Sequence, residues 1–132
     1  MNKAKILVVD HEKEFLLLMQ ERLRAEGYDV ATAQDGEEGL KVAKQYRPNL
    51  VICDIRMPKK DGYEFLRELR ETVDKSLPVI IASVIDEFDK IKEAYKDDAD
   101  FYITKPVELE KLSKNIRTIL SLQKLRRKDA ES

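Results

Sequence analysis

The sequence predicts an α/β fold in which a doubly wound, five-stranded parallel sheet is covered by helices on both faces. Five short apolar runs alternate with amphipathic stretches of helical period. The runs at 6–9, 50–53 and 79–82 are almost continuously apolar, as strands buried on both faces are. The 132 residues are enough for one domain with a substantial core.

The first half of the chain predicts two strand–helix units. The expected strands of the whole chain lie at 6–9, 28–33, 50–53, 79–82 and 101–103. The second strand alternates most clearly between apolar and polar residues, and it is expected at an edge of the sheet. The first helix is predicted by an apolar stripe on one face: Phe15, Leu16, Met19 and Leu23. The second begins at Asp35, which forms a capping box with Glu38, and ends before Pro48.

The second half predicts three more helices. Asp61 is expected to cap the third and Asp86 to begin the fourth, while Pro106 suits the first turn of the fifth. The stripe of the fifth helix is followed by Leu122 without an intervening Gly or Pro, so this helix is expected to reach at least Leu122. Residues 1–122 are expected to form the domain, and 123–132 a charged helical extension or linker.

Composition restricts the class of protein. Charged residues make up 39% of the chain, but the net charge is −1, so no basic field favours nonspecific nucleic-acid binding. The single cysteine, Cys53, cannot form an internal disulfide, which favours a reducing compartment. The apolar runs are too short to span a bilayer. We expect a cytoplasmic domain without direct contact to nucleic acid or membrane.

Ionisable and hydroxyl side chains gather where the strands are predicted to end, and this edge forms the binding sites of doubly wound sheets. They are Asp10, His11, Glu12, Asp54, Ser83, Thr104 and Lys105. Two acids, a hydroxyl and a lysine indicate phosphate chemistry with Mg²⁺, and a carboxylate can attack phosphorus as a nucleophile. The chain lacks a Gly-x-Gly-x-x-Gly or Walker motif, which argues against a dinucleotide or P-loop site.

Four fragments resemble the receiver domains of bacterial two-component response regulators. In chain order they are ILVVD at 6–10, DIRMP at 54–58 followed by DG at 61–62, PVIIAS at 78–83, and YITKP at 102–106. The resemblance extends from Lys5 to about Leu120. It implies the (βα)₅ fold called flavodoxin-like or CheY-like, and a phosphorylation-dependent signalling switch.

The resemblance also implies a metal site and a phosphorylation site. Asp54 would accept a phosphoryl group from a histidine kinase or a histidine phosphotransfer protein. Asp10, Asp54 and the backbone carbonyl of Arg56 would hold Mg²⁺ or Mn²⁺, with His11 or Glu12 as a further candidate ligand.

The remaining matches imply a switch. Ser83 and Lys105 would assist Asp54 in catalysis, Pro106 would follow Lys105 in a cis peptide bond, and Ser83 and Tyr102 would shift after phosphorylation. The shift would change the surface of the fourth helix, fifth strand and fifth helix, where an output domain, a partner protein or a second copy would bind. Such a domain catalyses its own phosphorylation but is not a metabolic enzyme.

His11 departs from the family pattern, which has two successive acids after the first strand. Mg²⁺ binding is expected to be weaker, because imidazole is a poor ligand for this ion. Three interpretations of His11 stay open. It is a loop residue without a role, a protonated imidazole that replaces part of the cation's charge, or a ligand that selects a softer metal such as Mn²⁺, Co²⁺ or Zn²⁺.

Two rival functions differ in class. A pseudo-receiver that binds a partner without phosphorylation is supported by His11 alone. An aspartate-nucleophile phosphohydrolase needs a general acid two residues after the nucleophile, and Arg56 occupies that position after Asp54, which argues against this function.

Overall fold

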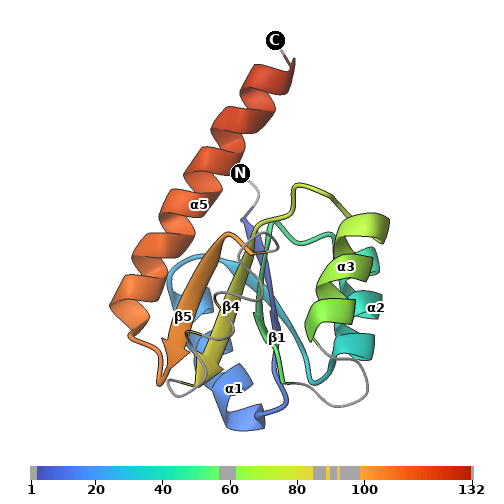
Figure 1. The fold of residues 1–132 in the computed structure, drawn as a ribbon. Helices are drawn as coiled ribbons and strands as arrows, with labels where there is room; N and C mark the ends of the chain where they lie inside the picture. Colours follow the sequence, from blue (N-terminus) through green and yellow to red (C-terminus); the bar gives the residue numbers. More distant parts are fainter. Residues whose placement is uncertain (1–2, 57–61, 85–88, 90–91, 93–98, 132) are drawn as a thin grey trace.

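The computed structural model describes residues 3–56, 62–84, 89, 92 and 99–131. Its elements, shown in Figure 1, are in chain order β1 (Lys5–Val9), α1 (Lys13–Ala25), β2 (Asp29–Ala33), α2 (Gly36–Tyr46), β3 (Leu50–Asp54), α3 (Gly62–Thr72), β4 (Val79–Val84), β5 (Phe101–Lys105) and α5 (Leu109–Glu131). The predicted cap at Asp61 and most of the predicted fourth helix, including its start at Asp86, lie outside the described residues.

The strands form one parallel sheet in the order β2-β1-β3-β4-β5. This arrangement confirms the predicted doubly wound sheet and places β2 at an edge, as expected. In the register of the sheet, Val9 at the end of β1 lies beside Ala33 of β2 and Cys53 of β3. The residues that follow, Asp10 and Asp54, therefore emerge next to each other at the carboxyl edge.

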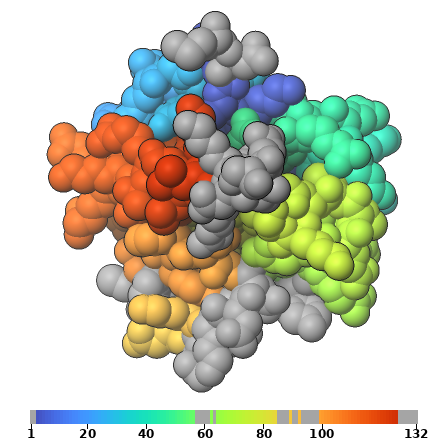
Figure 2. All heavy atoms as spheres, turned by 90° about the horizontal axis from the view of Figure 1, so that it is seen from above, coloured from blue at the N-terminus to red at the C-terminus, as the bar shows by residue number. Residues whose placement is uncertain are grey.

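Alternation along the strands divides the core into two layers. Ile6 and Val8 of β1 pack with the apolar stripes of α1 and α5, whereas Leu7 and Val9 pack with those of α2 and α3. In the space-filling view of Figure 2, the orange-red atoms of α5 and the cyan and green atoms of α2 and α3 occupy opposite sides of the molecule. The nearly uninterrupted apolar strands of the sequence are thus explained by helices on both faces.

The boundaries of α2 follow from its sequence. The side chain of Asp35 accepts the N–H of Glu38 at 2.8 Å, which confirms the predicted N-cap. The carboxylate of Glu38 faces the N–H of Gln34, at 3.5 Å, so the return bond of the capping box is displaced by one residue. The helix ends at Tyr46, and Arg47 adopts a left-handed conformation with φ 54° before Pro48.

The start of α5 differs from the prediction. The N–H of Leu112 donates to the carbonyl of Glu108 at 3.0 Å, so the helix begins at Leu109 and Pro106 lies before its first turn. The other end is longer than the predicted minimum of Leu122, because the helix continues to Glu131 and projects beyond the sheet (Figure 1). No helix in the described part of the chain is long and apolar enough to cross a membrane.

Gly62, the first residue of α3, permits a close approach to Ile55, the residue that follows β3. A Cβ atom at this position would lie 2.8 Å from the Cα and 2.5 Å from the Cδ1 of Ile55, closer than real Cβ contacts. We predict that Gly62→Ala lowers the free energy of unfolding by about 1–3 kcal/mol, because the added methyl group and Ile55 must move apart. Urea denaturation measures this change. Glu71→Ala, at an exposed position of the same helix, should change stability by less than about 0.5 kcal/mol; equal stabilities of the two variants would contradict the close approach.

Candidate functional site

Asp10 and Asp54 end neighbouring strands and are both withdrawn from solvent. Asp10 is fully buried, and its Oδ1 accepts the N–H of Glu12 at 2.9 Å. Asp54 is 7% exposed, and its Oδ1 accepts the N–H of Arg56 at 3.0 Å. Each carboxylate is therefore oriented by the backbone two residues further along the chain.

Lys105 joins the two carboxylates. Its Nζ donates to Asp10 Oδ2 at 2.7 Å and to Asp54 Oδ2 at 3.1 Å. Lys105 is the last residue of β5, and β4 separates β5 from β3, so the long side chain reaches across the end of β4. The peptide bond that follows, Lys105–Pro106, is cis, as the family resemblance implied.

Burial and charge act differently on the members of this cluster. Burial raises the pKa of Asp10 above its ordinary 3.8, and this effect outweighs the lowering by the hydrogen bonds from Lys105 and Glu12. For Lys105, burial lowers the pKa, but the hydrogen bond to Asp10 and the charge of Asp54 outweigh it and hold the pKa above 10.5. The geometry explains why burial decides the direction for Asp10 but not for Lys105. The Lys105 ammonium group faces two carboxylates, whereas Asp10 faces a single ammonium group that also contacts Asp54.

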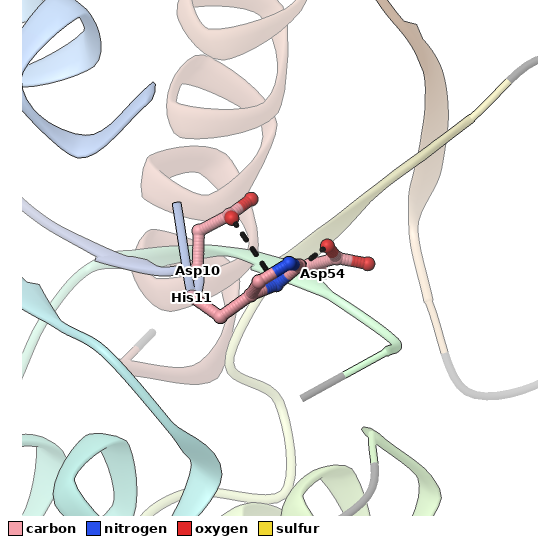
Figure 3. Close-up of side chains that lie close together, drawn as sticks. All are labelled: Asp10, His11 and Asp54. Atoms are coloured by element: carbon pink, nitrogen blue, oxygen red, sulfur yellow. Dashed lines mark ion pairs between the residues drawn. The ribbon is translucent and has the colours of Figure 1, made fainter. Parts of the chain in front are cut away.

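His11 lies between the same two carboxylates, as Figure 3 shows. Its Nδ1 is 3.7 Å from Asp10 Oδ1 and 3.6 Å from Asp54 Oδ2, while 45% of the side chain is exposed. Both distances are longer than a hydrogen bond of roughly 2.7–3.2 Å. The imidazole therefore faces the acids from the solvent side without being bonded to either of them.

Two further residues contact Lys105 in ways that the sequence did not reveal. Glu12 Oε1 lies 3.6 Å from Lys105 Nζ. This acid, which the sequence offered as a candidate metal ligand, therefore forms an ion pair with the lysine. The ring of Phe15 lies 4.6 Å from the same Nζ, a cation–π distance. The helical stripe had assigned Phe15 to the core; only its position five residues after Asp10, in the first turn of α1, indicated proximity to the site.

The predicted switch residues lie on β4 and β5. Ser83 is buried one residue beyond Ala82, which lies beside Asp54, and Ser83 itself is in register with Thr104. Tyr102 is in register with Ile81 and packs against the α2–α3 side of the core. Both belong to the strands that separate Asp54 from the outer edge of the sheet.

Cys53 precedes Asp54 but points into the core. Burial, followed by the charges of Asp54 and Asp10, raises the pKa of its thiol. It therefore remains a neutral, apolar core residue, as the sequence indicated.

The comparisons with known proteins agree with this geometry. The family model for the response regulator receiver domain matches residues 6–117. The chain belongs to the response regulator receiver domain family. It is accordingly a receiver domain of two-component signalling.

Individual relatives cover nearly all of this receiver domain. The alkaline phosphatase synthesis transcriptional regulatory protein PhoP of Bacillus subtilis (strain 168) is 41% identical over 121 residues, which are 91% of this chain and 49% of that protein. The structure of a response regulator receiver domain protein from Clostridium thermocellum has a TM-score of 0.84 at 34% identity and covers 92% of this chain and 98% of its own. NtrX from Brucella abortus has a TM-score of 0.90 at 29% identity, covering 98% of this chain and 29% of its own. The chain spans about half the length of the curated relatives it matches.

Receiver domains typically bind Mg²⁺, and the donors here fit that ion only in part. Asp10, His11 and Asp54 each place one ligand atom within 4.8 Å of the others. The two carboxylates are the oxygen ligands that Mg²⁺ prefers, whereas the third donor is an imidazole nitrogen, which suits transition metals.

The buried charge of Asp10 predicts a stability effect. Because the pKa of Asp10 is higher in the folded protein than its ordinary 3.8, the folded state binds this proton more tightly, and the ionised form destabilises the fold at neutral pH. We predict that Asp10→Asn raises the free energy of unfolding at pH 7, in metal-free buffer, by on the order of 1 kcal/mol. The gain should shrink as the pH falls toward 3.8, where the parent becomes protonated.

Urea denaturation of parent and variant at pH 7 and pH 4 tests this expectation. Glu21→Gln, which removes an exposed carboxylate from α1, is the matched control and should show neither the gain nor its pH dependence. A less stable Asp10→Asn at pH 7 would mean that the bond to Lys105 outweighs the burial of the charge.

Proposed function

We propose that this receiver domain is a phosphorylation-dependent switch that accepts a phosphoryl group on Asp54 from a histidine kinase or a histidine phosphotransfer protein. The observation that carries the proposal is the bridge from Lys105 Nζ to Asp10 and Asp54. A fixed ammonium group beside a strand-end carboxylate is positioned to balance the charge of an incoming phosphoryl group.

In the proposed reaction, this chain supplies a nucleophile, Asp54, and a positive charge, Lys105. A carboxylate oxygen of Asp54 attacks the phosphorus of the donor's phosphohistidine, and an acyl phosphate forms. The P–N bond breaks, and its electron pair stays on the donor's imidazole nitrogen. Lys105, which contacts Asp54 Oδ2 before the reaction, then donates to a phosphoryl oxygen.

The residues beside Lys105 would also hold a divalent cation. Asp10, Asp54 and the backbone carbonyl of Arg56 would hold Mg²⁺ or Mn²⁺, and the bound cation would supply positive charge to the phosphoryl oxygens. The two oxygens of Asp10 have different neighbours, because Oδ2 accepts a hydrogen bond from Lys105 Nζ while Oδ1 lies 3.7 Å from His11 Nδ1. With an imidazole as the third donor, we expect Mg²⁺ to bind more weakly than at a site with three carboxylates.

Phosphorylation would change the conformation of residues on β4 and β5. The Ser83 hydroxyl would donate to a phosphoryl oxygen, and Tyr102 would reposition on β5. The affected face would comprise β5, α5 and the predicted fourth helix, most of which lies outside the described residues. Because the relatives with transcriptional regulator names are about twice as long as this chain, an output domain is the first candidate partner, and a homodimer or another protein the second. The extension of α5 beyond 122 would carry the change to that partner.

A second candidate function is a phosphorylation-independent interaction module. His11 favours it, because the imidazole replaces an acid, and the lysine already neutralises part of the charge of Asp10 and Asp54. The two functions differ in whether Asp54 becomes phosphorylated at all.

We predict that Asp54→Asn abolishes phosphorylation. The parent, incubated with acetyl phosphate and Mg²⁺ or Mn²⁺, should gain the mass of one phosphoryl group, and the variant should gain none, because an amide is not a nucleophile toward phosphorus. Intact mass spectrometry measures both.

Asp29→Asn is the control, because Asp29 is an exposed acid at the start of β2, at the opposite edge of the sheet. It should be phosphorylated as the parent is. An Asp54→Asn protein that gains the same mass would exclude Asp54 as the acceptor, and an unmodified parent would favour the interaction module.

A further inference from the structure

We infer that the site formed by Asp10, His11 and Asp54 prefers a divalent transition-metal ion of the Zn²⁺ or Co²⁺ type over Mg²⁺, with His11 Nδ1 as a direct ligand. The inference deepens the proposed function, because it concerns the cation of the same site. It selects one of the three interpretations of His11 that the sequence left open.

The first argument is the orientation of the imidazole. His11 follows Asp10 directly, and adjacent side chains usually diverge, yet Nδ1 faces an oxygen of Asp10 and an oxygen of Asp54 (Figure 3). The ring therefore presents a nitrogen donor to both carboxylates at once. The ring leaves 45% of its side chain exposed, so solvent and ions reach it without a rearrangement of the core.

The second argument is the spacing of the donor atoms. The two N···O separations are 3.7 and 3.6 Å, too long for hydrogen bonds. Ligands of a tetrahedral Zn²⁺ with bonds near 2.1 Å are about 3.4 Å apart. Neighbouring ligands of an octahedral Mg²⁺ are about 2.9 Å apart. The two observed N···O separations are therefore a few tenths of an ångström from the tetrahedral spacing and more than twice as far from the octahedral one.

The third argument is the chemistry and charge of the donors. One imidazole and two carboxylates are a typical ligand set of Zn²⁺, and a site with three protein ligands keeps one position for water. For Mg²⁺ the same set is poor, because an imidazole nitrogen stands where this ion prefers an oxygen ligand. Glu12 is paired with Lys105, at 3.6 Å, rather than with the other donors.

The single histidine of the chain makes a direct test possible, because the imidazole nitrogens give one set of ¹⁵N resonances. Untagged protein would be titrated with Zn²⁺ and, separately, with Mg²⁺, without a phosphodonor. We expect Zn²⁺ to shift the Nδ1 resonance strongly and Mg²⁺ to leave it almost unchanged. An unshifted Nδ1 at saturating Zn²⁺, or a shift confined to Nε2, would overturn the inference.

Calorimetry on matched variants measures the preference itself. We expect the parent to bind Zn²⁺ at least about 100-fold more tightly than Mg²⁺, since imidazole favours Zn²⁺. His11→Asp should bind Mg²⁺ about tenfold more tightly than the parent, and its preference for Zn²⁺ should shrink. His11→Ala should lose at least about tenfold in Zn²⁺ affinity. Glu21→Gln, on the exposed face of α1, should bind both ions as the parent does.

The outcomes separate this inference from the proposed function. Equal Zn²⁺ affinities of the parent and His11→Ala would refute the role of His11 but leave phosphorylation of Asp54 untouched. A His11-dependent Zn²⁺ site in a protein that acetyl phosphate does not modify would support the inference and refute the switch.

Discussion

The bridge from Lys105 to Asp10 and Asp54 is the interaction on which the site depends. Without it, two buried carboxylates would face each other across the ends of β1 and β3. The sheet provides the bridge, because its order places β5 two strands from β3 and a lysine is long enough to span β4. The bridge also keeps a positive charge beside Asp54 before a phosphoryl group arrives. The proposed function relies on this contact, whereas the burial of the Asp10 charge opposes the stability of the fold.

His11 changes the balance of this charge cluster rather than its architecture. The imidazole occupies the position of an acid and faces the oxygens that the acid would have accompanied. The neighbouring Glu12 lies 3.6 Å from Lys105 Nζ, and it is not among the three residues whose ligand atoms gather at this site in the described part of the chain. The chain thus retains Asp54, which is the proposed phosphoacceptor, together with Lys105 and Asp10, and it has an imidazole nitrogen where the family resemblance implies a second acid. The inferred consequence is a change in metal preference, because the predicted sheet and helices are present.

The sequence predicts the sheet, its edge strand and the gathering of Asp10, Asp54 and Lys105, because uninterrupted apolar strands require helices on both faces and strand ends share one edge. The sequence does not predict which side chains contact the Lys105 ammonium group, since these contacts depend on the directions of the side chains in three dimensions. Glu12 pairs with Lys105. The ring of Phe15, a residue of the apolar stripe of the first helix, contacts the same ammonium group. The start of α5 was misplaced because Pro106 suits a first helical turn locally, yet the first backbone bond of the helix begins at Glu108.

The titration of Lys105 tests the bridge most directly. Its Nζ can be followed by ¹⁵N NMR as the pH is raised, in the parent and in Asp54→Asn, both free of metal. The account predicts that Lys105 titrates above the ordinary 10.5 in the parent, and at a lower pH in the variant, which loses one of the two carboxylates. A parent Lys105 that titrates below 10.5, or at the same pH in both proteins, would mean that the ammonium group does not bridge Asp10 and Asp54 in solution.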